Sequence, residues 1–448
     1  MPLTLAALSQ FLNTRPGVKH YRVAFSGGMD SMVLLHSMSS LRAQGAEWLL
    51  TAVHVHHGLH VEADQWQQFC EHTCRSLDVP CHVMQVDASP VTGESPEATA
   101  RHLRYQAMSD VMQDDEVLLT AHHQDDQAET LLLQLFRGSG VPGLAAMPAQ
   151  ISFSNGLLVR PFLDYSRQQL LDYATHNQLE WVDDSSNRDH RYDRNYLRHD
   201  ILPLLSQRWP GLAKTLSRSA VHMADADYCL DELAKLDLLS VTTEQKGTLN
   251  IDGLLALDER RLHNLLRVWL RDLGLAVPSQ RQMQHIVNDV IQAGAEANPC
   301  VRWPGVEVRR YRQQLYAFAG MAGDLVSQRL DWNPVNSLLI AGVGRLRLST
   351  TDGGGLSPTL LQSDDLHIGF RQGGERVRPA HRGHQHELKK LFQEAGVPPW
   401  ERDRTPILYQ GDEIVSIAGL CDSDAYIASQ DQQGLSLEWD KCFAEAFI

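Results

Sequence analysis

The strongest constraint on the fold lies between residues 21 and 35, where the sequence reads YRVAFSGGMDSMVLL. An apolar segment typical of a β-strand (21–25) runs into the loop SGGMDS (26–31), and an apolar helix is expected over 31–41. Adjacent glycines allow the backbone to approach a ligand closely. The first N–H groups of the following helix have no partner within the helix and carry partial positive charge. The segment therefore predicts a phosphate-binding site.

The residue types in this loop distinguish it from other phosphate-binding loops. It has no lysine, which the Walker A motif requires, and it lacks the third spaced glycine of a dinucleotide-binding loop. SGGMDS resembles instead the pyrophosphate loop of the N-type ATP pyrophosphatases, which split ATP between its α and β phosphates and transfer AMP to a substrate. Asp30 adds a carboxylate that could hold a magnesium ion. We expect the loop to bind ATP through Ser26, Gly27, Gly28, Met29, Asp30 and Ser31.

The first third of the sequence alternates between strand and helix patterns. Strands are expected at 21–25, 49–56, 81–86 and 116–121, and helices at 31–41, 62–77, 97–112 and 125–136. This alternation predicts an α/β fold with a doubly wound parallel sheet, in which ligands bind at the carboxyl ends of the strands. Three polar motifs fall at such ends: SGGMDS, HVHHG (54–58) and AHHQDDQAET (121–130).

The histidines of HVHHG lie at the end of a strand. His54, His56 and His57 alternate between its two faces, so they cannot easily share one metal ion. Partly exposed histidines at a strand edge are the simpler interpretation, and a contact of His54 and His56 with the ATP nucleotide is the functional one.

The acidic residues of AHHQDDQAET open a helix. Asp126 and Glu129 are three residues apart and share one helical face. Acidic residues are ordinary in the first turn of a helix, but here the turn lies at the ligand-binding edge of the sheet. The pair could share a magnesium ion with Asp30 through Asp126, or receive a substrate ammonium group.

Basic residues gather in three places. In SPEATARHLRY (95–105), Arg101 and Arg104 lie on the side of a helix that carries Glu97, and this side is either solvated or turned toward a phosphate or carboxylate. The segment 188–203 interleaves Arg194 and Arg198 with two tyrosines, which suits a phosphate-rich ligand. The last eighty residues contain a basic, glycine-containing loop that suits an RNA backbone and includes Arg376, Arg378, Arg382, Lys389 and Lys390.

Length and composition limit the class of protein. The 448 residues suggest three domains, which we place at 1–212 (catalytic), 213–325 (mostly helical) and 326–448 (small α+β). In the middle domain we expect helices over 254–273 and 278–293 and a small hairpin over 301–318, and in the last domain a strand, a basic loop, a short helix and a strand. No apolar run is long enough for a membrane span, the N-terminus lacks a secretory signal pattern, and the odd number of seven cysteines does not suggest a disulfide framework. We therefore expect a cytoplasmic protein. The net charge of −15 argues against bulk attraction to nucleic acid, but a local basic face can still bind it.

Taken together, the motifs resemble tRNA(Ile)-lysidine synthetase. SGGMDS, HVHHGL, SPEATARHLRY, HHQDDQAET and DDSSNRDHRYDRNYLRHDILP occur in this order, and FRQGGERVRP with LKKLFQEAGVPPWERDRTPILY resembles the last domain of that family. The resemblance implies a ligase that uses ATP and Mg²⁺ to adenylate C2 of the wobble cytidine in the CAU anticodon of tRNA(Ile). Free L-lysine then displaces AMP and gives lysidine. Decoding changes from AUG to AUA, and amino acid identity from Met to Ile.

The chemistry that such a reaction needs suggests the following roles for individual residues as a hypothesis, grouped here by function. The catalytic residues are Asp30, Asp126 and Arg194. Lysine is bound by Arg101, Asp126 and Glu129, with Arg101 or Arg194 on its carboxylate. A metal is bound by Asp30 and Asp126. The tRNA is bound by Arg198 and the five basic C-terminal residues Arg376, Arg378, Arg382, Lys389 and Lys390.

The sequence departs from the family at one position and leaves alternatives open. His60 stands where family members often carry an arginine, so the chain lacks a guanidinium for a phosphate contact at this position. A tRNA-thiolating enzyme with the same loop generally carries C-x-x-C sites or a catalytic cysteine pair, and the sequence has no C-x-x-C. A small-molecule amidating ligase would leave the basic C-terminal domain without a role, and a non-catalytic nucleotide or RNA binder would leave the charged sheet edge unused. The sequence leaves a homodimer open.

Overall fold

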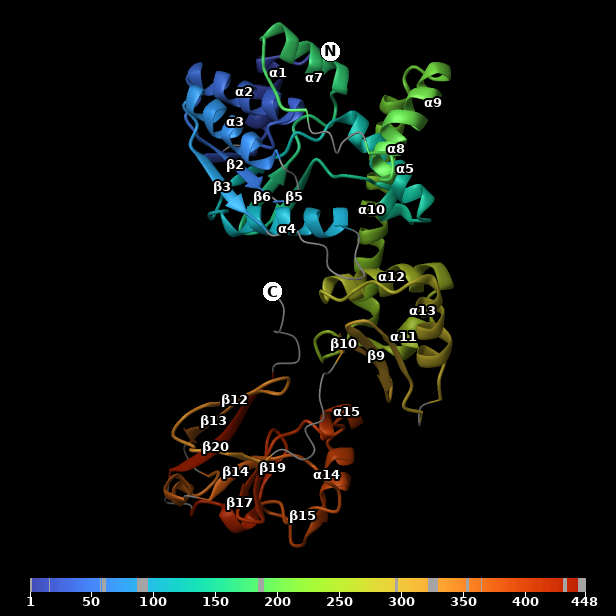
Figure 1. Ribbon diagram of the computed structural model, residues 1–448. Coiled ribbons are helices and arrows are strands. Elements are labelled where there is room, and N and C mark those ends of the chain that lie inside the picture. The colour runs from blue at the N-terminus through green and yellow to red at the C-terminus, as the bar shows by residue number, and fades with distance from the viewer. Residues whose placement is uncertain are drawn as a thin grey trace. The chain divides into compact units, whose positions relative to one another are not determined.

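The computed structural model describes residues 2–15, 17–56, 58, 62–86, 96–183, 189–294, 297–320, 329–351, 354–363, 365–429 and 433–441, without the side chains of 96–98 and 100. The chain separates into two compact units, 1–230 and 231–448, whose elements are labelled in Figure 1. None of the described helices is both long and apolar enough to cross a membrane.

Unit 1 is built around a six-stranded sheet with the strand order β3-β2-β1-β4-β6-β5. Its strands are β1 (His20–Ala24), β2 (Leu49–His56), β3 (Cys81–Gln85), β4 (Val117–Leu119), β5 (Gln150–Phe153) and β6 (Gly156–Val159). All neighbours pair in parallel except β5 and β6, which form an antiparallel hairpin at one edge. The prediction of a largely parallel sheet in an α/β domain is confirmed, whereas the edge hairpin was not foreseen.

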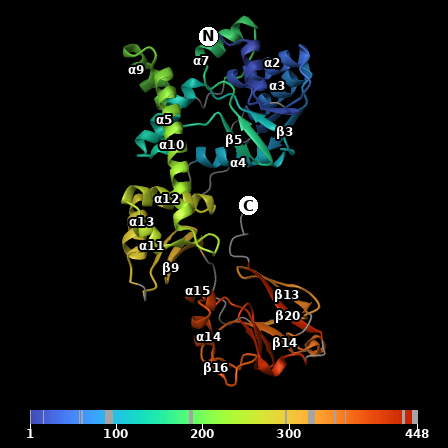
Figure 2. The same cartoon turned by 180° about the vertical axis from the view of Figure 1, so that it is seen from behind.

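Helices cover both faces of this sheet. The helices that unit 1 contains before residue 212 are α1 (Leu5–Asn13), α2 (Met29–Ala43), α3 (Ala63–Ser76), α4 (Pro96–Asp110), α5 (Gln124–Phe136), α6 (Val141–Leu144), α7 (Arg167–His176), α8 (Asp193–Tyr196), the π-helix η2 (Leu197–Ile201) and α9 (Leu202–Arg208). Both ribbon views place α4 on the face opposite α2 and α3 (Figures 1 and 2). The sheet has a hydrophobic core on each face, and alternate residues of β4 pack in the two cores. Val117 and Leu119 pack in the core that contains α2, and Leu118 packs in the core that contains α4.

Unit 2 begins within the long helix α10 (Leu212–Val241) and contains a helical part followed by β-rich parts. A single helix was expected over 254–273, but the structure has α11 (Ile251–Leu255) and α12 (Glu259–Asp272). The break occurs because the Asp258 side chain accepts hydrogen bonds from the backbone N–H groups of Arg260 and Arg261 and so starts a new helix. The helix expected over 278–293 is α13 (Gln280–His285) continued by the π-helix η3 (Ile286–Ile291).

The strands of unit 2 form several small sheets. The hairpin expected over 301–318 is part of a four-stranded sheet made of β7 (Leu249–Asn250), β10 (Gln314–Ala319), β9 (Val306–Tyr311) and β8 (Cys300–Trp303). A five-stranded sheet follows, made of β11 (Leu330–Asp331), β14 (Leu366–Gly369), β17 (Ile407–Gln410), β18 (Glu413–Ile417) and β19 (Cys421–Asp422). The remaining strands are β12 (Leu338–Ile340), β13 (Gly344–Thr351) and β20 (Gly434–Lys441) in one sheet, and β15 (Arg376–Val377) with β16 (His386–Glu387) in another.

Short helices complete the C-terminal part of unit 2. They are η4 (Pro358–Gln362), α14 (Leu388–Glu394), α15 (Pro399–Arg402) and η5 (Asp424–Tyr426). The expected order of strand, basic loop, short helix and strand corresponds to β14, the β15–β16 segment, α14 and β17. The domain boundaries placed after residues 212 and 325 stay predictions.

A buried ion pair ties β1 to the start of β4. The Arg22 guanidinium donates hydrogen bonds of 3.1 and 2.9 Å to the carboxylate of Glu116, and both side chains are almost fully buried. Burial by itself raises the pKa of Glu116, but hydrogen bonds from Arg22 and from the Gln113 backbone outweigh it, so the net pKa is lowered.

We expect Glu116→Gln to lower the free energy of unfolding by about 3–5 kcal/mol, because it leaves the Arg22 charge buried without a partner. Urea unfolding measures this loss, and the double variant R22M/E116L, which removes both charges, should recover most of it. Because the folded-state pKa of Glu116 is lowered, its contribution is complete above the unfolded pKa of about 4.3 and is lost as the pH falls through the folded pKa. A Gln variant as stable as the parent at pH 7 would contradict this account.

Candidate active site at the end of the parallel sheet

The loop after β1 needs glycine at its second position. Gly27 has φ +84°, a conformation that L-residues rarely adopt, and an added Cβ would lie 3.0 Å from Sγ of Cys70 on α3. Its carbonyl accepts a hydrogen bond of 3.0 Å from the backbone N–H of Val182. The loop is therefore held close against α3 and against the segment after α7.

The N-terminus of α2 faces the space above this loop. The helix begins at Met29, two residues before the expected start, so Asp30 lies in its first turn. Its N-cap is Gly28, which makes no side-chain capping bond. The hydroxyls of Ser26 and Ser31 lie 3.1 Å apart, and Ser31 donates to the Gly28 carbonyl over 2.9 Å. Open backbone N–H groups and clustered hydroxyls provide donors for an anion.

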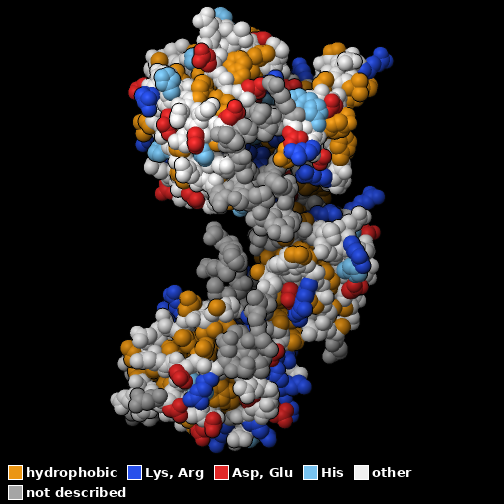
Figure 3. All heavy atoms as spheres, viewed as in Figure 1, with side chains coloured by type: hydrophobic (Ala, Val, Ile, Leu, Met, Phe, Trp, Pro, Cys, Tyr) orange, Lys and Arg blue, Asp and Glu red, His pale blue; other side chains and the backbone are white. Residues whose placement is uncertain are grey.

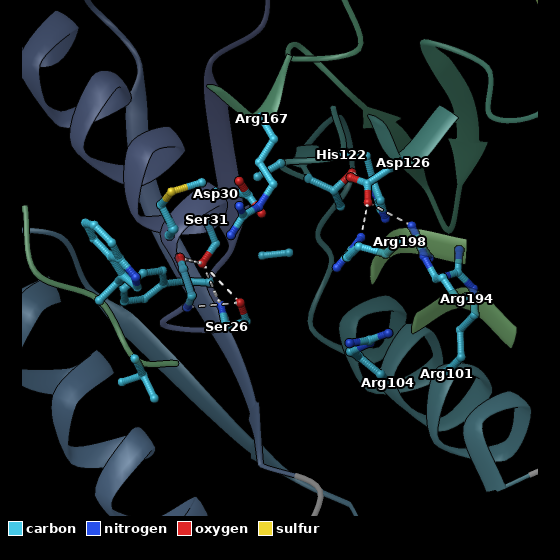
Figure 4. A pocket seen from close by; sticks show the side chains of 18 of the residues that line it. Ser26, Asp30, Ser31, Arg101, Arg104, His122, Asp126, Arg167, Arg194 and Arg198 are labelled. Atoms are coloured by element: carbon cyan, nitrogen blue, oxygen red, sulfur yellow. Dashed lines mark hydrogen bonds and ion pairs between the residues drawn. The ribbon is translucent and has the colours of Figure 1, made fainter. Parts of the chain in front are cut away.

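The loop opens into a cavity of about 880 Å³ at the topological switch point of the sheet. The chain runs from β1 outward to β2 and β3 and then returns to β4 on the other side of β1, so the segments after β1 and β4 diverge and leave a crevice. Side chains from both segments and from further elements, including α4, α7, α8 and η2, line it, as Figure 4 shows. The labelled ones are Ser26, Asp30, Ser31, Arg101, Arg104, His122, Asp126, Arg167, Arg194 and Arg198.

A cluster of two acids and two arginines forms one wall of the cavity. Glu129 accepts hydrogen bonds of 2.7 Å from Nε of Arg194 and 2.6 Å from Nε of Arg198. Asp126 accepts a bond of 2.9 Å from Nη2 of each arginine on the same oxygen, Oδ1. The two acids come from α5, and the two arginines come from α8 and η2. The predicted pairing of Asp126 and Glu129 on one helical face is confirmed, and the structure adds that both are neutralised by arginine.

The electrostatics of this wall depend on His123, the N-cap of α5. Its Nε2 lies 3.6 Å from Asp30 and 3.5 Å from Asp126, so it connects the carboxylates that follow β1 and β4. Burial lowers the pKa of His123, but Asp126 and Asp30 outweigh it and the net pKa is raised. For Asp126, burial raises the pKa, and His123 with the two arginines reverses this and lowers it. Burial lowers the pKa of the neighbouring His122 to about 3, so that imidazole is neutral near pH 7.

Asp30 has the features of a magnesium ligand. Its Oδ1 is buried and makes no hydrogen bond, which leaves a carboxylate oxygen without a partner beside the helix N-terminus. Within the described ranges, no cluster of three or more His, Cys, Asp or Glu side chains forms a ready cation site. The unpaired oxygen of Asp30 is one ligand of the kind that magnesium takes together with water and substrate phosphates.

Other predicted ligand-binding residues also face the cavity. His54 and His56 line it beyond the loop; Nδ1 of His54 lies 2.9 Å from the Phe25 carbonyl, and Nε2 of His56 lies 3.1 Å from Asp64. Arg101 packs its guanidinium over the ring of Tyr105, with 5.0 Å to the ring centroid. The side chain of Glu97, residues His57 and His60, and Arg188 at the start of the basic segment lie outside the described residues.

The five basic residues predicted in the C-terminal domain lie around β15 and α14 of unit 2 and differ in their surroundings. Arg382 pairs with Glu394 at 2.9 Å, and Arg378 pairs with Asp424 at 3.2 Å. Arg376, Lys389 and Lys390 are exposed, and no ion pair involves them among the residues that the structure describes. The sixth predicted tRNA contact, Arg198, lies in unit 1 as part of the charged wall of the cavity.

Sequence reasoning missed two contributors to the site. Arg167, the first residue of α7, points its side chain toward Asp30, and its backbone N–H donates to Asp125 over 2.8 Å. The capping role of His123 was also missed. The sequence signal for Arg167 was the N-cap Ser166 before it, which marks a second helix N-terminus. For His123 the spacing of three residues to Asp126 was the available signal.

The fold and the site define an ATP pyrophosphatase of the PP-loop class, and a family model described as a PP-loop domain matches residues 4–205. Two further models, the TilS substrate binding domain and the TilS substrate C-terminal domain, match residues 249–316 and 366–439. The tRNA(Ile)-lysidine synthase of Coxiella burnetii is 40% identical over 432 residues, which cover 96% of this chain and 95% of that protein. The tRNA(Ile)-lysidine synthase of Alkalilimnicola ehrlichii is 43% identical over 421 residues, which cover 94% of this chain and 93% of that protein. The chain therefore belongs to the tRNA(Ile)-lysidine synthase family.

Likeness to solved structures is weaker. A crystal structure of the TILS C-terminal domain matches with 21% sequence identity and a TM-score of 0.22, and covers 26% of this chain and 98% of that one. A TM-score this low supports no conclusion about geometry.

The conformation of Gly27 gives a testable prediction with a matched control. We expect Gly27→Ala to lower the free energy of unfolding by about 1–2 kcal/mol, because alanine is strained at positive φ. Gly28→Ala places a methyl group 3.5 Å from Oγ of Ser26 at an ordinary φ of −72°, and should change stability by less than about 0.5 kcal/mol. Chemical denaturation measures both, and equal effects of the two substitutions would contradict the assignment.

Proposed function

We propose that this chain joins free L-lysine to C2 of the wobble cytidine of tRNA(Ile) with a CAU anticodon. ATP first transfers AMP to the C2 carbonyl oxygen and releases diphosphate; the ε-amine of lysine then displaces AMP. The main support is that the anion cradle at α2 and the charged wall on α5 line the same cavity in a chain of this family. Such a reaction takes place in the cytoplasm, where all three substrates are found.

In the ATP half of the reaction, the donors at the N-terminus of α2 hold the phosphates. Preorganised N–H groups and the hydroxyls of Ser26 and Ser31 meet the negative charge that develops on the leaving diphosphate. Arg167 adds a positive charge beside Asp30, and His54 with His56 contacts the nucleotide farther from the loop. A bound magnesium ion would neutralise phosphate charge, and Asp30 is the proposed ligand. Asp126 could join it through Oδ2, because both arginine bonds go to Oδ1 and, among the described residues, Oδ2 accepts a hydrogen bond only from the His123 backbone N–H.

In the lysine half, Asp126 and Glu129 receive the ammonium group and an arginine receives the carboxylate. Both acids already carry arginine partners, so an incoming ammonium replaces a guanidinium instead of filling an empty site. The displaced Arg194 would then face the lysine carboxylate or the phosphate of the AMP group, and Arg101 is the other candidate for the carboxylate. This exchange keeps the net charge of the buried wall near zero, which limits its desolvation cost.

Thiolation of tRNA is the alternative that the site favours least. None of the described residues that line the cavity is a cysteine, and Cys70 and Cys74 are buried on α3. Burial raises the pKa of the Cys70 thiol well above its ordinary value, which disfavours the reactive thiolate.

The direct test is mass analysis of the wobble nucleoside after incubation of the protein with ATP, L-lysine and tRNA(Ile) transcript. We expect a mass gain equal to lysine minus water, and stoichiometric AMP. Asp30→Asn should abolish both the mass gain and the AMP release while preserving the fold. AMP release without nucleoside change, or a nucleoside change that does not need lysine, would overturn the proposal.

We expect Asp126→Asn to raise the KM for lysine about 10- to 150-fold, because a charged hydrogen bond to the ammonium contributes roughly 1.5–3 kcal/mol. ATP affinity should change by less than about threefold. Asp125→Asn is the matched control, since it removes the same charge from a carboxylate that accepts from the Arg167 backbone and not from the two arginines of the wall. Steady-state kinetics at saturating tRNA give both values. Unchanged lysine kinetics in the Asp126 variant would exclude the assigned role.

Binding of tRNA should be strongly salt-dependent if the basic residues of unit 2 contact phosphates. We expect affinity to fall on the order of a thousand-fold between 50 and 200 mM salt. Lys389→Ala and Lys390→Ala should each reduce the slope of log affinity against log salt. Arg382→Ala should reduce it less, because that guanidinium is already paired with Glu394. Fluorescence anisotropy with labelled tRNA measures the slopes, and a flat salt response would rule out these phosphate contacts.

A further inference from the structure

The segment that carries the two arginines of the charged wall also exposes aromatic rings to solvent. Over residues 192–203 we define the rim aromatics as Tyr192 and Tyr196, which are 36% and 48% exposed. His199 and Pro203 continue at spacings of three and four residues, are exposed, and line the cavity. The exposed rings therefore lead directly to the mouth of the cavity.

The backbone beneath these rings is firmly held. Arg194 and Arg198 anchor the inner side of the segment to the acids of α5, and Leu197 is buried against Leu131 and Leu132. The tyrosine rings lie outside that contact, so their exposure is not explained by packing. A fixed backbone that presents aromatic faces is a suitable stacking platform, because little conformational entropy is lost on binding.

The charge around the platform favours a polyanion as its partner. Two acids on the segment already have partners: Asp189 forms an ion pair with Arg191, and Asp200 lies in hydrogen-bond contact with His190, each at 2.6 Å. Arg208, Lys214 and Arg218 farther along are exposed, and no ion pair involves them within the described part of the chain. Figure 3 shows histidine, basic and hydrophobic side chains side by side in the region of α8 and α9. Aromatic and basic side chains together are typical of surfaces that bind single-stranded nucleic acid.

We propose that the rim aromatics stack on the unpaired RNA bases next to the base that enters the cavity. This inference rests on the proposed function, since it concerns how an RNA loop delivers its base. A base that reaches an enclosed site must leave the stack of its neighbours, and those neighbours then lose stacking energy. Tyr192 and Tyr196 replace that stacking energy, whereas the ring of His199 at the cavity mouth is already stacked on the ring of His190. The platform tolerates different bases because every base has an aromatic face.

Binding of the anticodon stem–loop RNA to the full-length protein tests the inference. We expect Tyr196→Ala to weaken binding about 5- to 150-fold, and Tyr196→Phe, which keeps the ring, to stay within about twofold of the parent. Tyr228→Ala is the matched control: this tyrosine lies on α10, is 66% exposed and does not line the cavity. The dissociation constant for ATP, which should not change, checks that the site is intact.

A second RNA separates stacking from other contacts. We compare the complete stem–loop with one that lacks the base next to the target cytidine. The parent protein should bind the incomplete stem–loop more weakly, whereas the Tyr196→Ala variant should bind the two RNAs with nearly equal affinity. If the missing base and the Tyr196→Ala substitution reduce RNA affinity independently, so that their effects add, the stacking assignment is wrong. It is also wrong if Tyr196→Phe and Tyr196→Ala reduce RNA affinity equally. If the parent protein makes no lysidine, the proposed function fails. If it makes lysidine but Tyr196→Ala and Tyr192→Ala bind the loop as the parent does, only this inference fails.

Discussion

The site depends on one interaction, the pairing of Asp126 and Glu129 with Arg194 and Arg198. The four groups are largely buried, and leaving a single buried charge without its partner costs several kcal/mol. The cluster also holds the segment from α8 to α9 against α5, and in this way it forms one side of the crevice beside β4. Because the four formal charges cancel, the wall can contact a phosphate, an ammonium or a carboxylate by exchanging partners, without burying an isolated ion.

The opposite side of the crevice, at the N-terminus of α2, offers backbone donors instead of charged side-chain donors. There the donors are backbone groups, which have no side-chain entropy to lose and no charge to neutralise before the substrate arrives. The positive φ of Gly27 and the close approach of Cys70 hold the loop in one shape, so the α2 N-terminus is aimed at the cavity before any ligand binds. His123 connects the two sides, since its Nε2 lies within 3.6 Å of carboxylates from both. The site thus combines a rigid phosphate cradle with a wall whose ion pairs can be exchanged.

Much of this arrangement was accessible from the sequence, for identifiable reasons. Strands β1 to β4 and the helices between them follow from local periodicity, and the grouping of three motifs at one edge follows from the rule that parallel strands end together. The partners of Asp126 and Glu129 did not follow, because Arg194 and Arg198 are more than 60 residues away and could equally have faced solvent or phosphate. The apolar periodicity of 254–273 also predicted one helix where the structure has two, because the Asp258 side chain caps the start of a second helix with two hydrogen bonds. The four-stranded sheet of unit 2 was underestimated because β7 is only two residues long and carries almost no pattern.

The π-helical turn η2 has a consequence for the direction of α9. Its backbone closes with a bond from the N–H of Leu202 to the carbonyl of Leu197, which accommodates one more residue than an α-helical turn. Arg194 lies before this widened turn and Arg198 near its start, so the extra residue mainly affects the segment that continues into α9. Loss of one residue from 197–201 would restore a regular helix and rotate everything after it by about 100° around the axis. The length of this turn therefore sets the direction in which α9 leaves the charged wall.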